Sequence, residues 1–412
     1  MDKLLIVVLG GTVASSLLAA PVLKEGSVKL SQDDTRKVVV EYEIEDEPAI
    51  VTAAFSEGGT PINEVFTADV WGDVNKKVGV GVHTFYLDPS KFAPDREVSA
   101  ANMSVVLSVW ATNCPPDYMA VDLCYTNIVK FYANTNSFPG GFGSDRYKTT
   151  ELVMRRIPAA GIEWRMGNPS WVVERGFTAC NPNHYVTLSS DYYMAVYELT
   201  EAQYRCIDLG YGDSSATSRM PKGKLSYDAL RGTDYSWPAD LHQVTSASVI
   251  GKARALTELE FDLPTDAQWE YACRAGTQLI MSFEKEQNMD DVPPGQFKGD
   301  SNKVSSRSDP YAWYSRNSGN AAHEVGLLKP NPWGLYDMYG NLGEWCLDWQ
   351  RTDTTDSVTD PKGPGTGTAR VLRGGYFNDS CSSGLSGART SVSPSKGYTN
   401  YGARLVCPMG EW

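Results

Sequence analysis

The stretch "PNPWGLYDMYGNLGEWCLDW", Pro330–Trp349, holds three tryptophans and three acidic residues within twenty positions. It lies in a region with many glycines and aromatic residues and few long periodic segments. A domain with so little regular structure must bury large rings to gain stability. We therefore expect Trp333, Trp345 and Trp349 to lie in the core of a loop-rich domain.

Two acidic residues of this stretch are candidate metal ligands. Asp337 and Glu344 are hard oxygen donors seven residues apart, and Gly340 and Gly343 free the intervening backbone to turn its carbonyl groups inward. That arrangement predicts a calcium site, which the calcium concentration outside cells would fill even if binding were weak. The alternative is that both carboxylates accept hydrogen bonds from nearby backbone and arginines without an ion.

Upstream of this stretch, two short helices have matching start signals. In "LTEAQYRCIDLG" Thr200 is followed three residues later by Gln203, and in "LPTDAQWEYACRAG" Thr265 is followed by Gln268. Each pair predicts a capping box, in which the threonine oxygen accepts a backbone N–H while the glutamine reaches back. Gly276 is placed to end the second helix in a left-handed conformation.

Residues 21–133 have the pattern of short strands. In "VEYEIE", Val40–Glu45, apolar and acidic residues alternate, which puts the apolar groups on one face. Similar runs follow between turn residues, as in a small antiparallel β-sandwich of the immunoglobulin or fibronectin kind. The segment 134–147, rich in Gly, Pro and Ser and poor in aliphatic residues, predicts a linker to a second domain over 148–412.

Residues 1–20 have the pattern of a secretory signal peptide. Lys3 precedes the apolar run Leu4–Val13, and two alanines precede Pro21. We predict cleavage near Pro21 and a protein that is secreted, periplasmic or on the cell surface. A membrane anchor would need about twenty unbroken apolar residues. Two serines interrupt this run, so we expect no transmembrane anchor after cleavage.

The composition of the chain excludes some partners and metal sites. The formal net charge is −13, so a basic face for nucleic acid would have to be built against the field of the whole protein. We expect no nucleic-acid partner. The eight cysteines show no Cys-x-x-Cys spacing, which argues against a zinc site. Cys114 and Cys124 are the best candidates for a disulfide.

Five motifs occur in the order and spacing of one known family. They are "YYMAVYELTEAQY", "FDLPTDAQWEYACRAGT", "NPWGLYDMYGNLGEWCLDW", "RVLRGGYF" and "ARTSVSPSKGYTNYGARLV". Over Lys148–Val406 the sequence resembles the formylglycine-generating enzyme, or sulfatase-modifying factor, family. The resemblance implies an α+β, C-type-lectin-like fold that is loop-rich, with two main helices and small twisted sheets. Here the β-sandwich precedes that domain.

The resemblance also implies how calcium would be held. Asp337 and Glu344 would ligate the ion through their side chains, and Gly340 and Leu342 through main-chain oxygens. At Gly343 the family usually carries tryptophan, so the packing around the ion is expected to differ.

The redox chemistry of the family does not carry over to this sequence. The resemblance implies copper held by two cysteines after the glycine turn, whereas the segment after Gly375 offers Cys381 alone. Cu(I) needs two thiolates for linear coordination. A second branch of the family uses a three-histidine iron site, and the histidines here are isolated: His83, His184, His242 and His323. We expect neither copper nor iron and favour a protein that is not an enzyme, with Cys381 as its one catalytic candidate.

The C-terminal segment 376–401 has the composition of a binding loop. Tyrosine, serine and asparagine in loops combine rigid contact area with adaptable hydrogen bonding, as in antibody paratopes. The alternative for any one residue is an ordinary polar surface loop. The candidate ligand-binding residues are Tyr376, Phe377, Asn378, Asp379, Ser380, Ser382, Ser383, Tyr398, Thr399, Asn400 and Tyr401.

A codon bias runs through the same segment. Lys, Glu, Gln, Met and Trp cannot be reached by changing only the first two bases of an asparagine codon, and of these only Lys396 occurs there. Adenine-directed mutagenesis leaves such a bias in the variable proteins of diversity-generating retroelements, many of which resemble this fold. The hypothesis that follows is a diversified loop.

These features together predict an exported ligand-binding module with a structural calcium ion, whose ligand is a protein or a glycan outside the cytoplasm. Two alternatives stay open. One is a metal-dependent oxidoreductase acting on a cysteine or thiol, in which Cys381 works with Cys407. The other is a structural component of the cell envelope, in which the aromatic loop packs against a neighbour. No feature of the sequence specifies an oligomeric state.

Overall fold

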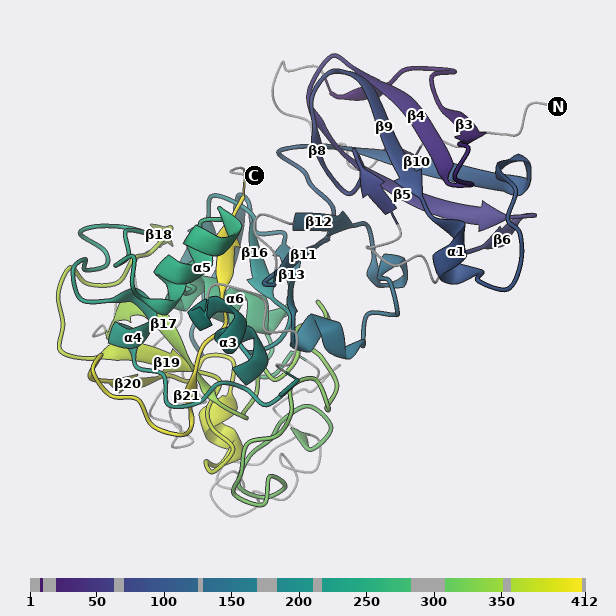
Figure 1. The fold of residues 1–412 in the computed structure, drawn as a ribbon. Helices are drawn as coiled ribbons and strands as arrows, with labels where there is room; N and C mark the ends of the chain where they lie inside the picture. The colour runs from purple at the N-terminus through teal and green to yellow at the C-terminus, as the bar shows by residue number, and fades with distance from the viewer. Residues whose placement is uncertain are drawn as a thin grey trace. The chain divides into compact units, whose positions relative to one another are not determined.

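The computed structural model describes residues 8–9, 20–62, 70–124, 129–168, 184–209, 217–282, 308–350 and 357–409. The chain divides into two compact units (Figure 1). The first comprises the residues up to Val121 and Ile128–Tyr147, with Trp412, and the second comprises Asp122–Asn127 and Lys148–Glu411. The predicted signal peptide lies outside the described residues except at positions 8, 9 and 20. In the part of the chain that is described, no helix is long and apolar enough to cross a membrane.

The first unit is a β-sandwich. One sheet is built on the antiparallel pair β5 (Ala49–Glu57) and β10 (Met103–Ala111), and the other on the pair β4 (Val38–Glu45) and β9 (Gly81–Leu87). Side chains of all four strands share one apolar core. The shorter elements are β1 (Val8–Leu9), β6 (Thr60–Pro61) and β8 (Lys76–Val78) in the first sheet, β2 (Val22–Leu23), β3 (Lys29–Gln32) and β7 (Val70–Gly72) in the second, and helix α1 (Pro89–Phe92).

Strand β4 contains the "VEYEIE" run, and its predicted alternation is confirmed. Val40, Tyr42 and Ile44 are buried, while Glu41 between them is exposed. The acidic residues therefore lie on the outer face of the sheet, as the period of two requires.

The segment 134–147 packs through its aromatic residues. Phe138 is buried, with its ring 4.3 Å from that of Tyr132 and 5.1 Å from that of Tyr147 between centroids. The Tyr147 hydroxyl donates to the Pro139 carbonyl at 2.8 Å. Composition predicted a linker here, but the aromatic contacts hold this segment against the hairpin of β11 (Tyr118–Asp122) and β12 (Val129–Tyr132) within the first unit.

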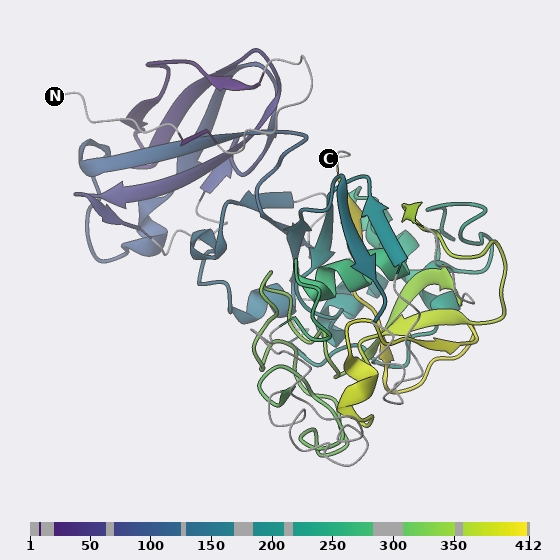
Figure 2. The ribbon, with the colours of Figure 1, turned by 180° about the vertical axis from the view of Figure 1, so that it is seen from behind.

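The second unit is loop-rich and carries several small sheets (Figure 2). In one sheet, β16 pairs with β13 and β22. In a second sheet, β15 pairs with β14 and β18. In a third sheet, β17 pairs with β19 and β21, and β19 also pairs with β20. Their bounds are β13 (Glu151–Ile157), β14 (Ile162–Met166), β15 (His184–Leu188), β16 (Tyr192–Ala195), β17 (Gly343–Trp349), β18 (Val358–Thr359), β19 (Arg370–Arg373), β20 (Thr390–Val392), β21 (Tyr401–Gly402) and β22 (Val406–Pro408).

Both predicted helices form, and both capping boxes are present. Thr200 and Gln203 exchange bonds of 3.1 and 3.2 Å at the start of α3 (Glu201–Leu209). Thr265 and Gln268 exchange bonds of 2.9 and 3.1 Å at the start of α6 (Asp266–Arg274). The left-handed end of α6 begins at Ala275, one residue before the predicted Gly276, which is also left-handed.

A third helix of equal length, α5 (Val249–Thr257), was not predicted. Ser248 caps it by accepting from the Gly251 N–H at 3.1 Å. No glutamine or glutamate stands three residues after Ser248, so the sequence lacks the full box that marked the other two starts. The short helix α4 (Tyr227–Arg231) also packs against α5. The predicted α+β class is confirmed.

The opening stretch lies against helix α6, as expected for core tryptophans. Trp345 is 0% exposed. Trp333 is half-buried against Tyr271 of α6, and Trp349 is half-buried beneath the Arg370 guanidinium, 3.3 Å from its ring centre. Trp345 thus lies in the core, and Trp333 and Trp349 lie at its edge.

The predicted disulfide is wrong. No bond joins Cys114 to Cys124. The Sγ atom of Cys124 instead lies 3.8 Å from that of Cys206 on α3. The sequence separation of Cys124 and Cys206 hides this neighbour, because the fold brings α3 back over the start of β13.

Candidate functional site

Glu344, at the start of β17, is held by a buried arginine. Arg404 donates from Nε and Nη2 to its carboxylate oxygens at 2.6–3.0 Å, and Trp269 Nε1 on α6 donates to Oε2 at 2.6 Å. Glu344 and Arg404 are both 0% exposed. Each carboxylate oxygen therefore already accepts two hydrogen bonds, which is about its full capacity.

Two further carboxyl groups are buried nearby, and we call Glu198, Asp337 and Glu344 the acid cluster. Glu198 accepts from the Leu342 N–H at 2.8 Å and from Asn341 Nδ2 at 2.6 Å. Burial raises the pKa of Glu198 well above its ordinary value, and the charges of Asp337 and Glu344 add to that effect.

Asp337 is the incompletely bonded member of the acid cluster. Its Oδ2 accepts from the Gly326 N–H at 2.7 Å, whereas its Oδ1 is buried without a hydrogen-bond partner. Burial raises the pKa of Asp337 to about 6, and the charge of Glu344 contributes in the same direction. An unpartnered carboxylate oxygen in the interior favours a bound proton or a bound cation.

The predicted calcium ligands fit an ion only in part. Asp337 fits, because its Oδ1 is buried and unpartnered. Glu344 does not fit, because the guanidinium of Arg404 already supplies a positive charge to both of its oxygens. Within the described ranges, no group of three or more His, Cys, Asp or Glu side chains is placed to hold a metal ion. The carbonyl groups of Gly340 and Leu342 would have to complete any site at Asp337.

An Asp337→Asn variant should lose part of the pH dependence of stability. The folded-state pKa of about 6 lies above the ordinary 3.8, so this group stabilises the fold fully below pH 3.8 and the stabilisation is lost as pH rises through 6. The difference corresponds to about 3 kcal/mol. Urea unfolding in EDTA between pH 4 and 7 measures it. Wild-type and variant free energies that run parallel over this range would contradict the assignment.

A second buried network joins α6 to β19. Asp266 and Glu270 on α6 both accept from Arg373, and Arg389 donates to Asp266 Oδ2 at 2.7 Å and to Glu270 Oε2 at 3.2 Å. Arg274 adds a 2.8 Å bond to Glu270. Burial alone would raise the pKa of Glu270, but the three guanidinium groups outweigh it and lower the pKa to about 2.

Tyrosines from the two ends of the segment 376–401 lie close together next to β17. The Tyr376 ring lies 5.5 Å from that of Tyr401, which lies 5.2 Å from that of Tyr398. Asn400 Nδ2 donates to Asn378 Oδ1 at 3.3 Å. We call Tyr376, Asn378, Tyr398, Asn400 and Tyr401 the tyrosine surface. It brings together predicted ligand-binding residues that lie more than twenty positions apart in the sequence.

Gly343 lies against the Tyr376 ring of the tyrosine surface. A Cβ atom at this position would lie 2.2 Å from Cε1 of Tyr376, so any side chain here would require the Tyr376 ring to move. The tryptophan that the family usually carries there could not coexist with this position of Tyr376. The presence of glycine where the family usually has tryptophan thus has a structural reason, because the Tyr376 ring packs directly against the Gly343 backbone.

The other predicted ligand-binding residues differ in exposure. Phe377 and Tyr401 are buried, so their side chains pack inside the domain and offer little area to a ligand. Tyr398 is 53% exposed, and Asn378, Ser380 and Thr399 are also exposed. Half-buried residues make up the rest: Tyr376, Asp379, Ser382, Ser383 and Asn400.

Main-chain hydrogen bonds fix the segment that carries these residues. The Phe377 N–H donates to the Asn341 carbonyl at 2.8 Å, and the Gly343 N–H donates to the Asn400 carbonyl at 2.9 Å. Lys224 donates its N–H to the Tyr398 carbonyl at 2.9 Å. The backbone of the tyrosine surface is therefore tied to β17 and to the preceding turn without using the exposed side chains.

A model of the sulfatase-modifying factor enzyme 1-like domain matches residues 157–409, which include α6, β17, the acid cluster and the tyrosine surface. The chain belongs to this family. Within the sulfatase-modifying factor domain, the five sequence motifs thus correspond to the two capped helices and to the segments around β17 and β19.

Members of the sulfatase-modifying factor family with curated descriptions align over part of their length. A formylglycine-generating enzyme of Streptomyces coelicolor is 37% identical over 157 residues, 35% of this chain and 46% of the relative. That of Thermomonospora curvata is 33% identical over 153 residues, 35% of this chain and 48% of the relative. The chain spans about half the length of these relatives. Among solved structures, Treponema denticola variable protein 1 is similar at 25% identity with a TM-score of 0.45, covering 63% of this chain and 96% of that protein.

The thiols of the sulfatase-modifying factor domain are not arranged as a Cys381–Cys407 pair. Cys381 is half-buried in a 3₁₀ turn at Cys381–Gly384, and burial raises its pKa. Cys407 is buried on β22, opposite Tyr193 of β16, and the two cysteines are not bonded to each other. A raised pKa lowers the thiolate fraction, which is the form that binds metals and attacks substrates.

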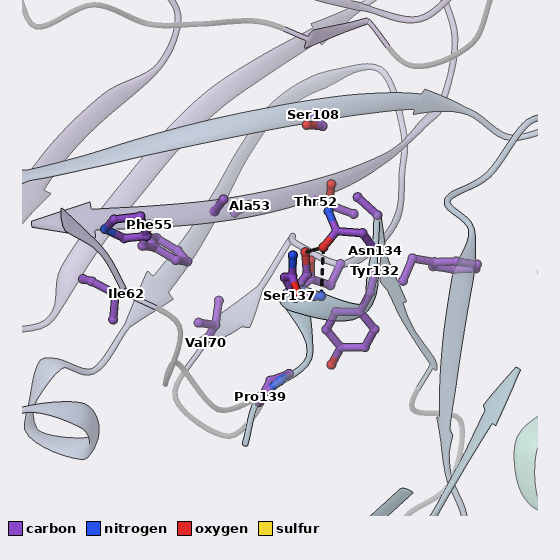
Figure 3. A pocket seen from close by; sticks show the side chains of 16 residues that line it. Thr52, Ala53, Phe55, Ile62, Val70, Ser108, Tyr132, Asn134, Ser137 and Pro139 are labelled. Carbon is purple, nitrogen blue, oxygen red and sulfur yellow. Dashed lines mark hydrogen bonds between the residues drawn. The ribbon is translucent and has the colours of Figure 1, made fainter. Parts of the chain in front are cut away.

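The β-sandwich unit contains a cavity of about 330 Å³ between β5 and the segment 131–139 (Figure 3). Phe55, Ile62 and Val70 supply apolar walls, and none of the described residues that line it carries a charge. Two polar side chains of its lining already bond within the protein: Asn134 accepts from the Ser137 hydroxyl at 3.3 Å, and Thr52 accepts from Trp110 at 3.1 Å.

Sequence reasoning did not predict the partners of the acid cluster. Arg404 stood out only as part of a family motif, and neither Glu198 nor Trp269 was singled out. Leu342 and Glu198 are 144 residues apart, and Trp269 and Glu344 are 75 apart. The one sequence signal was the alternative considered for Asp337 and Glu344, that nearby arginines would bond these carboxylates.

Proposed function

We propose that this chain is an exported ligand-binding member of the sulfatase-modifying factor family, and that the tyrosine surface contacts a protein or glycan outside the cytoplasm. One observation carries the proposal: two distant segments present tyrosine and asparagine side chains together on a backbone fixed by main-chain hydrogen bonds. Amphipathic rings on a rigid frame bind partners at low entropic cost. The ligand-binding role does not require the copper pair, which this sequence lacks.

Replacing exposed members of the tyrosine surface should weaken binding by about 10- to 100-fold, because aromatic anchors in such surfaces contribute about 1–3 kcal/mol each. The variants are Tyr398→Ala and Asn378→Ala, which change exposed side chains and leave the main-chain bonds in place. Arrays of defined oligosaccharides and of defined peptides, probed with the wild-type chain, supply the ligands. Affinities of the variants for the strongest hits are then measured by calorimetry.

Tyr235→Ala is the matched control, because Tyr235 is an exposed tyrosine of the same unit outside the tyrosine surface, at 38% exposure. It should bind like the wild type. Hits that all three variants bind with wild-type affinity would place the binding site elsewhere and would contradict the proposal.

We propose further that one structural calcium ion binds at Asp337 and that Cu(I) is not held tightly. The purified chain, titrated first with calcium and then with Cu(I) under reducing conditions, should show about one calcium that is lost in Asp337→Asn, because Oδ1 of Asp337 is the unpartnered oxygen. Stoichiometric copper that is lost in Cys381→Ser would instead support the oxidoreductase alternative. Calcium binding unchanged in Asp337→Asn would refute the site.

We also propose that the exposed positions of segment 376–401 are diversified. Diversification needs side chains that can change without loss of the fold, and Asn378, Ser380, Tyr398 and Thr399 meet that condition because they are exposed. Sequencing these codons across one population tests the proposal. Variation confined to exposed positions would support it, and invariant codons would end it.

A further inference from the structure

Two cysteines of the second unit lie in contact. The Sγ atoms of Cys124 and Cys206 are 3.8 Å apart, and neither residue is in a disulfide. A disulfide requires a separation of about 2.05 Å. The two sulfurs would therefore have to move closer together before a bond could form.

Independent hydrogen bonds hold the two cysteines beside the same segment, residues 148–151. Leu123, the neighbour of Cys124, donates its N–H to the Thr150 carbonyl at 2.9 Å. On α3, which carries Cys206, Gln203 Nε2 donates to the Glu151 carbonyl at 2.8 Å. The approach of the two sulfurs is therefore built into the fold, because Leu123 and Gln203 bond to the adjacent residues Thr150 and Glu151.

Local bonds also fix each cysteine's own backbone. The Cys124 N–H donates to Asp122 Oδ1 at 2.7 Å, and the capping box holds the first turn of α3. Two anchored backbones with touching sulfurs form a pre-organised pair, which reduces the entropy that must be lost when a bond forms.

We propose that Cys124 and Cys206 form a disulfide by exchange with a disulfide-bearing oxidant, such as oxidised glutathione or a thiol oxidoreductase. The Cys124 thiolate attacks one sulfur of the oxidant, and the first oxidant thiolate leaves. The Cys206 thiolate then attacks the Cys124 sulfur of the mixed disulfide, and the second oxidant thiolate leaves. Two protein thiols are oxidised, one oxidant disulfide is reduced to two thiols, and the two protons end on those thiols.

Exposure assigns the order of these two steps. Cys124 is half-buried and can be reached by the oxidant, whereas Cys206 is 0% exposed and can react only with a sulfur already inside the unit. Burial raises the pKa of Cys124 to about 12, and the neighbouring Cys206 adds to the rise. Few thiolates exist at neutral pH, so exchange in the folded chain is slow and accelerates about tenfold per pH unit between 7 and 9.

The disulfide would close a loop between residues 82 apart. Closing a loop of that length restricts the unfolded chain and should raise the midpoint of thermal unfolding of the second unit by about 5–15 °C. This proposal does not depend on ligand binding or on calcium.

The test uses the full chain, oxidised with glutathione disulfide both during refolding and after folding. Remaining thiols are alkylated, and peptides are mapped by mass spectrometry without reduction. We expect a linked pair of peptides containing Cys124 and Cys206, together with an unfolding midpoint that falls by the stated amount on reduction. In Cys124→Ser the midpoint should no longer respond to reduction.

Cys381→Ser is the matched control, because Cys381 is also a half-buried thiol of this unit, and it should keep both the linked peptides and the response to reduction. Cys206→Ala tests the buried partner, and in it Cys124 should be alkylated. The proposal is overturned if Cys124 and Cys206 are both alkylated after refolding with oxidant, or if Cys124 is linked to a different cysteine.

Discussion

An Arg404→Met variant should unfold with a free energy about 3–5 kcal/mol below that of the wild-type chain, because it leaves buried carboxylates without their cation. Arg404 is 0% exposed and makes three contacts shorter than 3.1 Å with Glu344. Its Nη1 also donates to the Ala195 and Val196 carbonyls at 3.0 and 2.9 Å. Methionine replaces the alkyl stem but leaves those acceptors unpaired, so packing alone cannot compensate.

The pH dependence distinguishes this cause from a simple packing defect. Without the positive charge of Arg404, the ionised carboxyl groups of the acid cluster are less stable in the folded chain. Their protonation should therefore restore part of the lost free energy of unfolding as pH falls from 7 to 5. Urea unfolding at both values measures the recovery. Arg219→Met is the control, because Arg219 pairs with Glu324 at 2.8 Å on the surface and should cost about 0–1 kcal/mol at either pH. An Arg404→Met loss as small as that of the control would contradict the role assigned to Arg404.

Arg373→Met should be comparably destabilising, by about 3–5 kcal/mol, because Arg373 joins two buried carboxylates of α6 to β19. Its guanidinium contacts both Asp266 and Glu270, and it donates to the Ser386 carbonyl at 2.9 Å. Arg389 also contacts both acids but is only half-buried, and Arg274 contacts Glu270, so neither replaces the fully buried Arg373. Chemical denaturation at pH 7 measures the loss.

Acid unfolding gives a second readout for Arg373. The folded-state pKa of Glu270, about 2, lies below its ordinary 4.5, so Glu270 contributes stability above pH 4.5 that is lost as pH falls toward 2. That contribution is about 3 kcal/mol. In Arg373→Met it should shrink, and the acid limb of the stability profile should move to higher pH. Arg373→Lys keeps the positive charge but loses the two-pronged hydrogen bonding of the guanidinium. The acid limb of its stability profile should therefore lie between those of the wild type and Arg373→Met. An unmoved acid limb would show that Arg373 does not set the Glu270 pKa.

The parts of the fold that local patterns encode could be predicted from the sequence. The capping boxes at Thr200 and Thr265 formed because each needs only four consecutive residues. The alternation of β4 gave the buried face of the sandwich for the same reason. Helix α5 was missed because Ser248 provides half of a capping box, and the packing in segment 134–147 was missed because glycine-rich composition hid its aromatic contacts.

The candidate site was predictable in its residues more than in its arrangement. Aromatic composition identified the segment 376–401, but it could not separate the exposed Tyr398 from the buried Tyr401, since that depends on where the ring meets Trp345. Spacing identified Asp337 and Glu344, but the charge that holds Glu344 comes from Arg404, 60 residues away. Long-range pairing of this kind leaves no local pattern.

The main-chain bonds beneath the tyrosine surface have a consequence for how this protein can change over time. Carbonyl and amide groups at Asn341, Gly343, Phe377 and Asn400 hold the frame, and every amino acid except proline supplies both groups. Mutations at exposed neighbours can then change the side chains that this surface presents at little cost to folding. The chemistry of the surface can change one residue at a time, and the frame does not have to be rebuilt for each change.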